Sequence, residues 1–131
     1  MSQRATASFD ITGWEEEPYH EQDGVKLSRT RVVKAFRGEI EGESRAELLM
    51  AMAGEDSAAY VGVERVSGRV NGREGSFVYL HTATMVGGVP SASWPVVAGS
   101  GTGELAGVSG KLTIDVLPEG GHVLTLDYEL G

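Results

Sequence analysis

Hydrophobic and polar residues alternate along most of the chain. Phe9 and Ile11 alternate with polar neighbours, and the run from Lys26 to Ile40 repeats the pattern with Val32 and Phe36 on the same side. Alternation with a period of two is typical of half-buried β-strands. Glycines interrupt these runs throughout the sequence, at the spacing expected for turns in an all-β sandwich or barrel. The pattern therefore predicts an all-β domain.

Two segments depart from this pattern. Glu15 to Gly24 contains adjacent acidic residues and Pro18, which are unfavourable inside a sheet, so we expect a loop there. Ser44 to Gly54 has the capping-box spacing from Ser44 to Glu47 and several good helix formers, which favour a helix. It nevertheless lies between strands with little room for a crossover, and strand pairing can override local propensity. We expect a strand, with a helix as the alternative.

Asn71-Gly72 is the strongest short signal for a β-hairpin, and it separates two alternating runs. A two-residue loop fixes the register of the two strands. Counting back from the loop gives the pairs Val70 with Arg73, Val66 with Phe77, Glu64 with Tyr79, and Gly62 with His81. Tyr60 shares that face. The opposite face carries Val61, Val63 and Arg65 together with Val78, Leu80 and Thr82.

The rest of the chain supplies further strands. Ser91 to Val97 contains Pro95 and is expected at an edge or bulge. Lys111 to Leu117 and His122 to Leu130 form a second hairpin. The total of about eight strands is enough to close an antiparallel β-barrel whose interior is filled by side chains or holds one small ligand. A length of 131 residues fits one domain over residues 1–131.

Composition narrows the partners. The net charge is −8 and the 11 basic residues are scattered, so no nucleic-acid partner is expected. No apolar run approaches the roughly 18 residues that cross a bilayer, and Met1 to Phe9 lacks a secretory h-region. We therefore expect a cytoplasmic protein with no membrane partner. There are no cysteines, and the 3 histidines lack ligand-like spacing, so no metal site is expected.

The candidate chemistry lies on the Asn71-Gly72 hairpin. If the face with Glu64, Tyr79 and His81 points inward, a carboxyl, a phenol and an imidazole share an apolar interior. Burial is then expected to raise the pKa of the carboxyl toward neutrality, where general acid and base catalysis is efficient. The alternative is that Glu64 accepts a hydrogen bond from His81 or a tyrosine and only satisfies buried polar groups.

Several large side chains could line a ligand cavity, because such cavities are mostly apolar with a few polar groups. Such side chains are more often simply part of the core. These residues are Trp14, Met50, Tyr60, Phe77, Trp94 and Tyr128. Gly101 to Ala106 matches a dinucleotide fingerprint, but no strand and helix flank it as that motif requires. No cofactor is expected.

Four ordered stretches, 62–68, 73–81, 99–107 and 124–130, resemble the domain of unknown function 3224 family. The resemblance covers nearly the full chain. It implies a barrel similar in fold to allene oxide cyclase and favours a strand over 44–54. It implies no established activity, and fold-level analogy cannot supply one.

Three functions follow from these patterns. The leading hypothesis is a barrel that binds a small, largely apolar molecule, with Glu64, Tyr79 and His81 as polar anchors. The competing hypothesis is a cofactor-independent cyclase or isomerase, in which Glu64 is the acid or base, His81 its partner and Tyr79 a donor to a carbonyl. The third is an interaction or structural module, which predicts an exposed apolar patch on the outer surface. Edge strands near Pro95 could also pair between copies to give a homo-oligomer.

Overall fold

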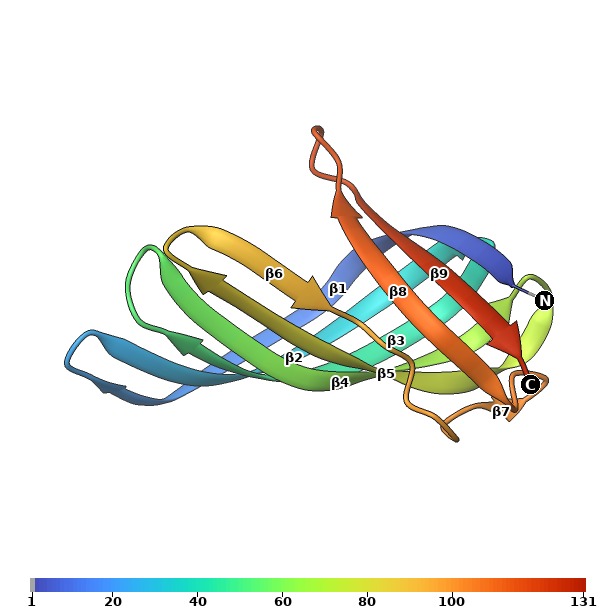
Figure 1. Ribbon diagram of the computed structural model, residues 1–131, viewed down its shortest axis with the longest axis horizontal. Coiled ribbons are helices and arrows are strands. Elements are labelled where there is room, and N and C mark those ends of the chain that lie inside the picture. The colour runs from blue at the N-terminus through green and yellow to red at the C-terminus, as the bar shows by residue number, and fades with distance from the viewer. Residues whose placement is uncertain (1) are drawn as a thin grey trace.

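The computed structural model describes residues 2–131, which form nine antiparallel strands in one sheet (Figure 1). The strands are β1 (Gln3–Gln22), β2 (Val25–Gly38), β3 (Ile40–Met52), β4 (Ser57–Val70), β5 (Arg73–Val86), β6 (Val89–Ser93), β7 (Thr102–Gly103), β8 (Val108–Val116) and β9 (His122–Leu130). Across residues 2–131 there is no helix that could cross a membrane. The predicted all-β fold is confirmed.

The strands follow the order β6-β5-β4-β3-β2-β1-β9-β8, with β7 paired to β5. The sheet nearly closes into a barrel, because residues 94–97, here named the seam segment, lie between β5 and β8. The Val97 amide donates to the Val78 carbonyl in β5 at 2.8 Å, and the Val96 amide donates to the Gly110 carbonyl in β8 at 2.9 Å. Isolated bridges, rather than a continuous strand, therefore complete the barrel wall.

The barrel is packed at one end and open at the other. Figure 1 shows the strands converging at the end that holds β7 and the C-terminus, and flaring where the β1–β2, β3–β4 and β5–β6 hairpins project. The main apolar core fills the convergent end and includes Phe36, Phe77, Leu124, Leu126 and Tyr128. A smaller cluster of Val32, Ala46 and Leu48 continues toward the flare, with Met50 and Tyr60 packed against it. The interior thus becomes less tightly filled toward the flare.

The loop expected over Glu15 to Gly24 is wrong, because β1 continues to Gln22 and only a tight turn joins it to β2. β9 pairs with β1 only as far as Phe9. Beyond that point β1 has a free edge, where proline and charge are tolerated. The register shifts just after Pro18, and Glu15 and Glu17 lie opposite Arg31 and Arg29, respectively, which offsets the repulsion between the acidic neighbours.

The strands β3, β4 and β5 test the predictions made for residues 44–54 and for the Asn71-Gly72 hairpin. Ser44 to Gly54 is a strand up to Met52, so the helical alternative is wrong. The hairpin register is confirmed at every predicted pair, including Glu64 opposite Tyr79 and Gly62 opposite His81. The strand predicted from Lys26 to Ile40 is interrupted at Glu39, where the chain turns into β3. The strand predicted from Ser91 to Val97 is β6 followed by the seam segment.

Gly42 in β3 and Gly68 in β4 lie directly opposite each other. Gly42 has a φ of +137°, a conformation that L side chains rarely adopt. A Cβ atom at Gly42 would lie 2.2 Å from the carbonyl oxygen of Ser67. The absence of a side chain is therefore what allows the two backbones to approach at this point.

Candidate functional site

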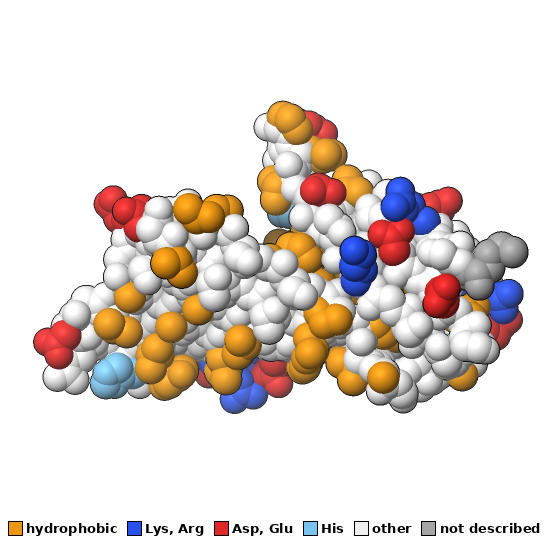
Figure 2. All heavy atoms as spheres, viewed as in Figure 1, with side chains coloured by type: hydrophobic (Ala, Val, Ile, Leu, Met, Phe, Trp, Pro, Cys, Tyr) orange, Lys and Arg blue, Asp and Glu red, His pale blue; other side chains and the backbone are white. Residues whose placement is uncertain are grey.

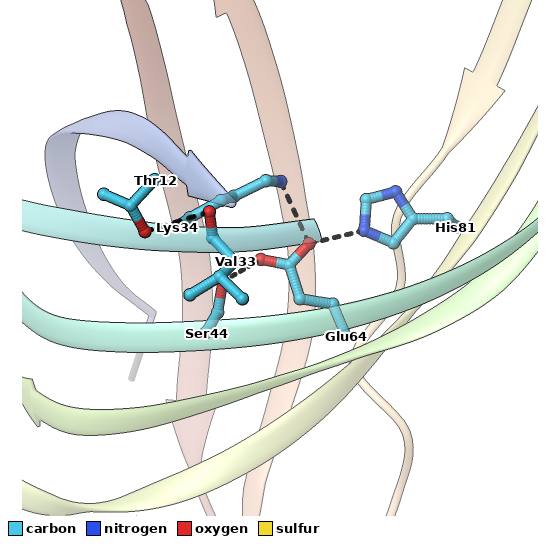
Figure 3. A network of polar contacts seen from close by, with 6 residues as sticks. All are labelled: Thr12, Val33, Lys34, Ser44, Glu64 and His81. Atoms are coloured by element: carbon cyan, nitrogen blue, oxygen red, sulfur yellow. Dashed lines mark hydrogen bonds and ion pairs between the residues drawn. The ribbon is translucent and has the colours of Figure 1, made fainter. Parts of the chain in front are cut away.

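Four neighbouring strands place polar side chains on one patch of the inner wall. These side chains, here named the polar network, are Lys34 on β2, Ser44 on β3, Glu64 on β4 and His81 on β5. Each is at least nine-tenths buried, and Glu64 is fully buried. Glu64 Oε1 accepts hydrogen bonds from Lys34 Nζ at 3.0 Å and is 2.8 Å from His81 Nε2, while Oε2 accepts from Ser44 Oγ at 2.5 Å. Figure 3 shows Lys34 and His81 reaching the same carboxylate oxygen from different directions.

The polar network keeps Glu64 ionised. Burial disfavours the charged form, but the hydrogen bond from His81, the charge of Lys34 and the hydrogen bond from Ser44 together outweigh it and lower the pKa of Glu64 from 4.5 to about 2. The expectation that the pKa of Glu64 shifts toward neutrality is therefore wrong, because it considered burial but omitted the donors on the neighbouring strands. Since an ionised carboxylate can only accept, Nε2 of His81 carries the proton between them.

Tyr79 lies beside the polar network, but its hydroxyl makes no hydrogen bond of normal geometry to any member of the network. Its side chain is fully buried, and its ring centroid is 4.9 Å from that of His81. The hydroxyl has no hydrogen-bond partner within the described residues. Burial and the nearby charge of Glu64 raise the pKa of Tyr79 well above its ordinary value of 10. Tyr79 therefore stays a neutral phenol.

A cavity of about 230 Å³ lies above the polar network, toward the flared end. Its floor includes Lys34, Glu64 and His81, and its rim includes the exposed side chains of Ile11 and Trp14. The remaining wall is mostly apolar and consists of Phe9, Val32, Ala46, Leu48, Met50, Tyr60, Trp94, Ile114 and His122. Figure 2 shows the surface notched between the β8–β9 hairpin and the flared part of the sheet. We name this space the barrel cavity.

The structure separates the six predicted ligand-lining residues into two groups. Trp14, Met50, Tyr60 and Trp94 line the barrel cavity. Phe77 and Tyr128 do not line it and instead belong to the packed core at the closed end. The Tyr128 hydroxyl accepts a hydrogen bond from Asn71 Nδ2 at 2.8 Å. Tyr79 is likewise behind the wall, whereas Glu64 and His81 are part of it.

Sequence reasoning missed Lys34 and Ser44. The signal was present, because Lys34 has the same parity as Val32 and Phe36, which were placed on the buried side of the strand. A charged residue at a buried position requires a buried partner. Glu64, at a buried position on another strand, was the available counter-ion. Lys34 and Glu64 are both charged residues at buried strand positions. Considered together, they predict a buried ion pair.

Shallow grooves also lie on the outer surface. One of about 540 Å³ is bordered by charged residues including Arg31, Arg45 and Glu47. It has no buried polar group at its base, so we place the site in the smaller barrel cavity. Beside the grooves, four exposed side chains form an apolar row across β3, β4 and β5, as predicted for an outer patch. They are Leu49, Val61, Val63 and Leu80, which are 39–52% exposed.

Within residues 2–131, no group of three or more His, Asp or Glu side chains is arranged to hold a metal ion. The buried carboxylate of Glu64 is instead surrounded by an ammonium, an imidazole and a hydroxyl. These donors occupy the oxygen atoms that a cation would need. The polar network is therefore suited to hold the ionised carboxylate of Glu64 in a fixed position rather than to bind a metal ion.

The chain matches the family described as Protein of unknown function (DUF3224) over residues 5–128. It is also similar to the crystal structure of a protein of unknown function from the DUF3224 family of Shewanella oneidensis MR-1, with 33% sequence identity and a TM-score of 0.85. That similarity covers 100% of this chain and 99% of the Shewanella chain. No curated protein matches the chain. Because the family match spans the barrel from β1 to β9, the chain belongs to the DUF3224 family.

Proposed function

We propose that this protein binds a small, largely apolar molecule in the barrel cavity. The observation that carries the proposal is the combination of an apolar wall with a few fixed polar groups at its floor, which is the usual composition of a small-molecule site. A cavity that served only packing would have no reason to keep Lys34 and Glu64 buried, because each ion is costly to remove from water.

The volume limits the size of the ligand. An engineered apolar cavity of roughly 150 Å³ accommodates benzene. The barrel cavity, at about 230 Å³, is larger by about one half. A molecule with one or two small rings, or a short branched chain, fits this space. Its apolar part would lie against Met50, Trp94 and Ile114, with any polar group directed to the floor.

Intrinsic fluorescence offers a direct test, because both tryptophans of the chain, Trp14 and Trp94, line the barrel cavity. Titration with indane, a bicyclic hydrocarbon, is expected to change the emission in a saturable way, and calorimetry should give the same dissociation constant. Ala46→Leu, which adds a larger side chain to the apolar wall of the barrel cavity, is expected to weaken binding. Ala35→Leu makes the same chemical change on the other side of the wall and should leave affinity unchanged.

The proposal fails if indane and other hydrocarbons of this size give no saturable signal with the wild-type protein. It also fails if Ala46→Leu and Ala35→Leu have equal affinities, because binding would then occur outside the barrel cavity. Thermal denaturation of both variants shows whether either has lost its fold.

The geometry favours binding over a cofactor-independent cyclase or isomerase. A general acid must hold a proton near neutral pH, whereas the pKa of Glu64 is lowered to about 2 by the groups around it. A general base needs a lone pair free for the substrate, whereas Glu64 is engaged with Lys34, Ser44 and His81. Tyr79, the intended donor to a carbonyl, does not line the barrel cavity.

A second candidate function is self-association through the apolar row, which the exposure of Leu49, Val61 and Val63 favours. The row is bordered by Glu47 and by Arg29, so a two-fold arrangement can place charges of opposite sign opposite each other. Light scattering after size exclusion is the test. A dimer that Val63→Lys dissociates, and that Ser67→Lys on the same outer face does not, supports this function, whereas a monomeric wild type at high concentration refutes it.

A further inference from the structure

Two buried nitrogen atoms of the cavity wall have no hydrogen-bond partner. Nδ1 of His81 and Nε1 of Trp94 are shielded from solvent, and in the described part of the chain neither makes a hydrogen bond of normal geometry, although the indole N–H lies near the Tyr60 hydroxyl. Both residues line the barrel cavity. Buried polar atoms normally have partners, and an unpaired one weakens the fold. The two nitrogen atoms therefore indicate that something absent from the protein itself completes the site.

The polar network determines what each nitrogen can do. Glu64 is an acceptor with an ammonium 3.0 Å away, so the proton between Glu64 and His81 lies on Nε2. A second positive charge on the ring would be buried without a counter-ion of its own, because Lys34 already neutralises Glu64. In a neutral ring with its proton on Nε2, Nδ1 is a bare acceptor. Figure 3 shows this second ring nitrogen facing away from the carboxylate. The indole Nε1 of Trp94 is always a donor.

We propose that the ligand is a neutral alcohol or phenol whose hydroxyl donates a hydrogen bond to Nδ1 of His81. The indole N–H of Trp94 donates a hydrogen bond to an oxygen atom of the same ligand. This inference rests on the proposed function and names the polar group that the apolar molecule carries. The half-buried Tyr60 ring lies beside His81 on the same wall, with its centroid 6.2 Å from that of His81.

Other polar groups fit the site less well. A ketone or ether can accept from Trp94, but it offers no donor to His81 and leaves Nδ1 unpaired. A carboxylate adds a buried negative charge, while the only buried ammonium on the wall, that of Lys34, already serves Glu64. A hydrocarbon leaves both nitrogen atoms unpaired. A hydroxyl is the simplest group that both donates and accepts.

Three compounds with one carbon skeleton test this inference: 2-indanol, 2-indanone and indane. Calorimetric titration of the wild-type protein should show 2-indanol binding about ten-fold more tightly than 2-indanone, the difference made by one paired acceptor. Equal affinities for the three compounds overturn the inference but leave the proposed function in place. Tighter binding of 2-indanone than of 2-indanol also overturns it. Failure of all three to bind overturns the proposed function and the inference with it.

Nitrogen NMR of protein labelled at histidine gives a readout that does not depend on affinity. Saturating 2-indanol should shift Nδ1 of His81, because a nitrogen that gains a donor changes its chemical shift, and indane at saturation should not. His20 and His122 serve as internal controls. A shift with both compounds, or with neither, contradicts the proposed contact. Trp94→Phe, which removes the indole N–H together with part of the apolar wall, should weaken the binding of 2-indanol by a larger factor than that of indane.

Discussion

Glu64→Gln should destabilise the protein by about 3 kcal/mol at pH 7. The pKa of Glu64 falls from 4.5 in the unfolded chain to about 2 in the barrel, and a change of this size corresponds to roughly 3 kcal/mol of unfolding free energy. Breaking a buried ion pair by removing one partner gives a similar value of roughly 3–5 kcal/mol, because the other charge stays buried. Lys34 is that charge, and it is 7% exposed.

The unfolding free energy of the wild-type protein should depend on pH through the ionisation of Glu64. Because the folded-state pKa of Glu64 lies below the unfolded-state value, its contribution is fully present above about pH 5 and is lost as the pH falls from 4.5 toward 2. Wild-type stability should therefore fall over this range more steeply than that of Glu64→Gln. The two proteins should differ by less at pH 3 than at pH 7, because part of the contribution of Glu64 is already lost at pH 3.

Urea denaturation at pH 7 and pH 3, followed by tryptophan fluorescence, measures both quantities. Glu47→Gln is the matched control, because Glu47 also accepts from two basic residues, Arg29 and Arg31, but lies exposed on the outer face. Its denaturation midpoint should stay close to that of the wild type. A Glu64→Gln variant within about 1 kcal/mol of the wild type at pH 7, or one with the wild-type pH slope, refutes the reasoning.

Three further variants test the buried ion pair, the close approach at Gly42 and the turn at Asn71. Lys34→Met combined with Glu64→Gln should be more stable than Glu64→Gln alone, because it removes the charge left without a partner; chemical denaturation of the single and double variants decides this. Gly42→Ala should cost about 2 kcal/mol or more, since its Cβ would lie 2.2 Å from a backbone oxygen, and an unchanged melting temperature contradicts it. Asn71→Gly should keep the turn, because glycine also adopts a positive φ, but lose the 2.8 Å hydrogen bond to Tyr128, at a cost of about 1 kcal/mol, which differential scanning calorimetry can measure.

The sequence was most informative where a local signal fixes a non-local register. Asn71-Gly72 adopts the left-handed conformation that this turn requires, with φ of +48° and +81°. From that turn, strict alternation placed Glu64 opposite Tyr79 and beside His81, as observed. The strand at Ser44 to Gly54 was also predicted correctly, because strand pairing on both sides determines its conformation more strongly than helix propensity does.

The errors arose where the answer depends on what lies on the neighbouring strand. Alternation cannot show that β9 leaves the edge of β1 free after Phe9, so Pro18 was taken as the end of a strand. Nor does one hairpin reveal the residues across from it in the barrel. Lys34 is 30 positions before Glu64 in the chain, and its ammonium reverses the direction in which burial alone would move the pKa of that carboxyl.

The seam segment makes one side of the barrel wall easier to open than the rest. β1 and β2 are joined by a long ladder, whereas β5 and β8 are held together through residues 94–97 by isolated bridges. Local opening is easiest where few backbone hydrogen bonds must break. The amides of Val96 and Leu112 should therefore exchange with deuterium sooner than those in the middle of β2. Trp94 belongs both to the seam segment and to the wall of the barrel cavity. A molecule bound against Trp94 should therefore stabilise the closed form of the seam. Slower deuterium exchange at the amides of Val96 and Leu112 would then report that the barrel cavity is occupied.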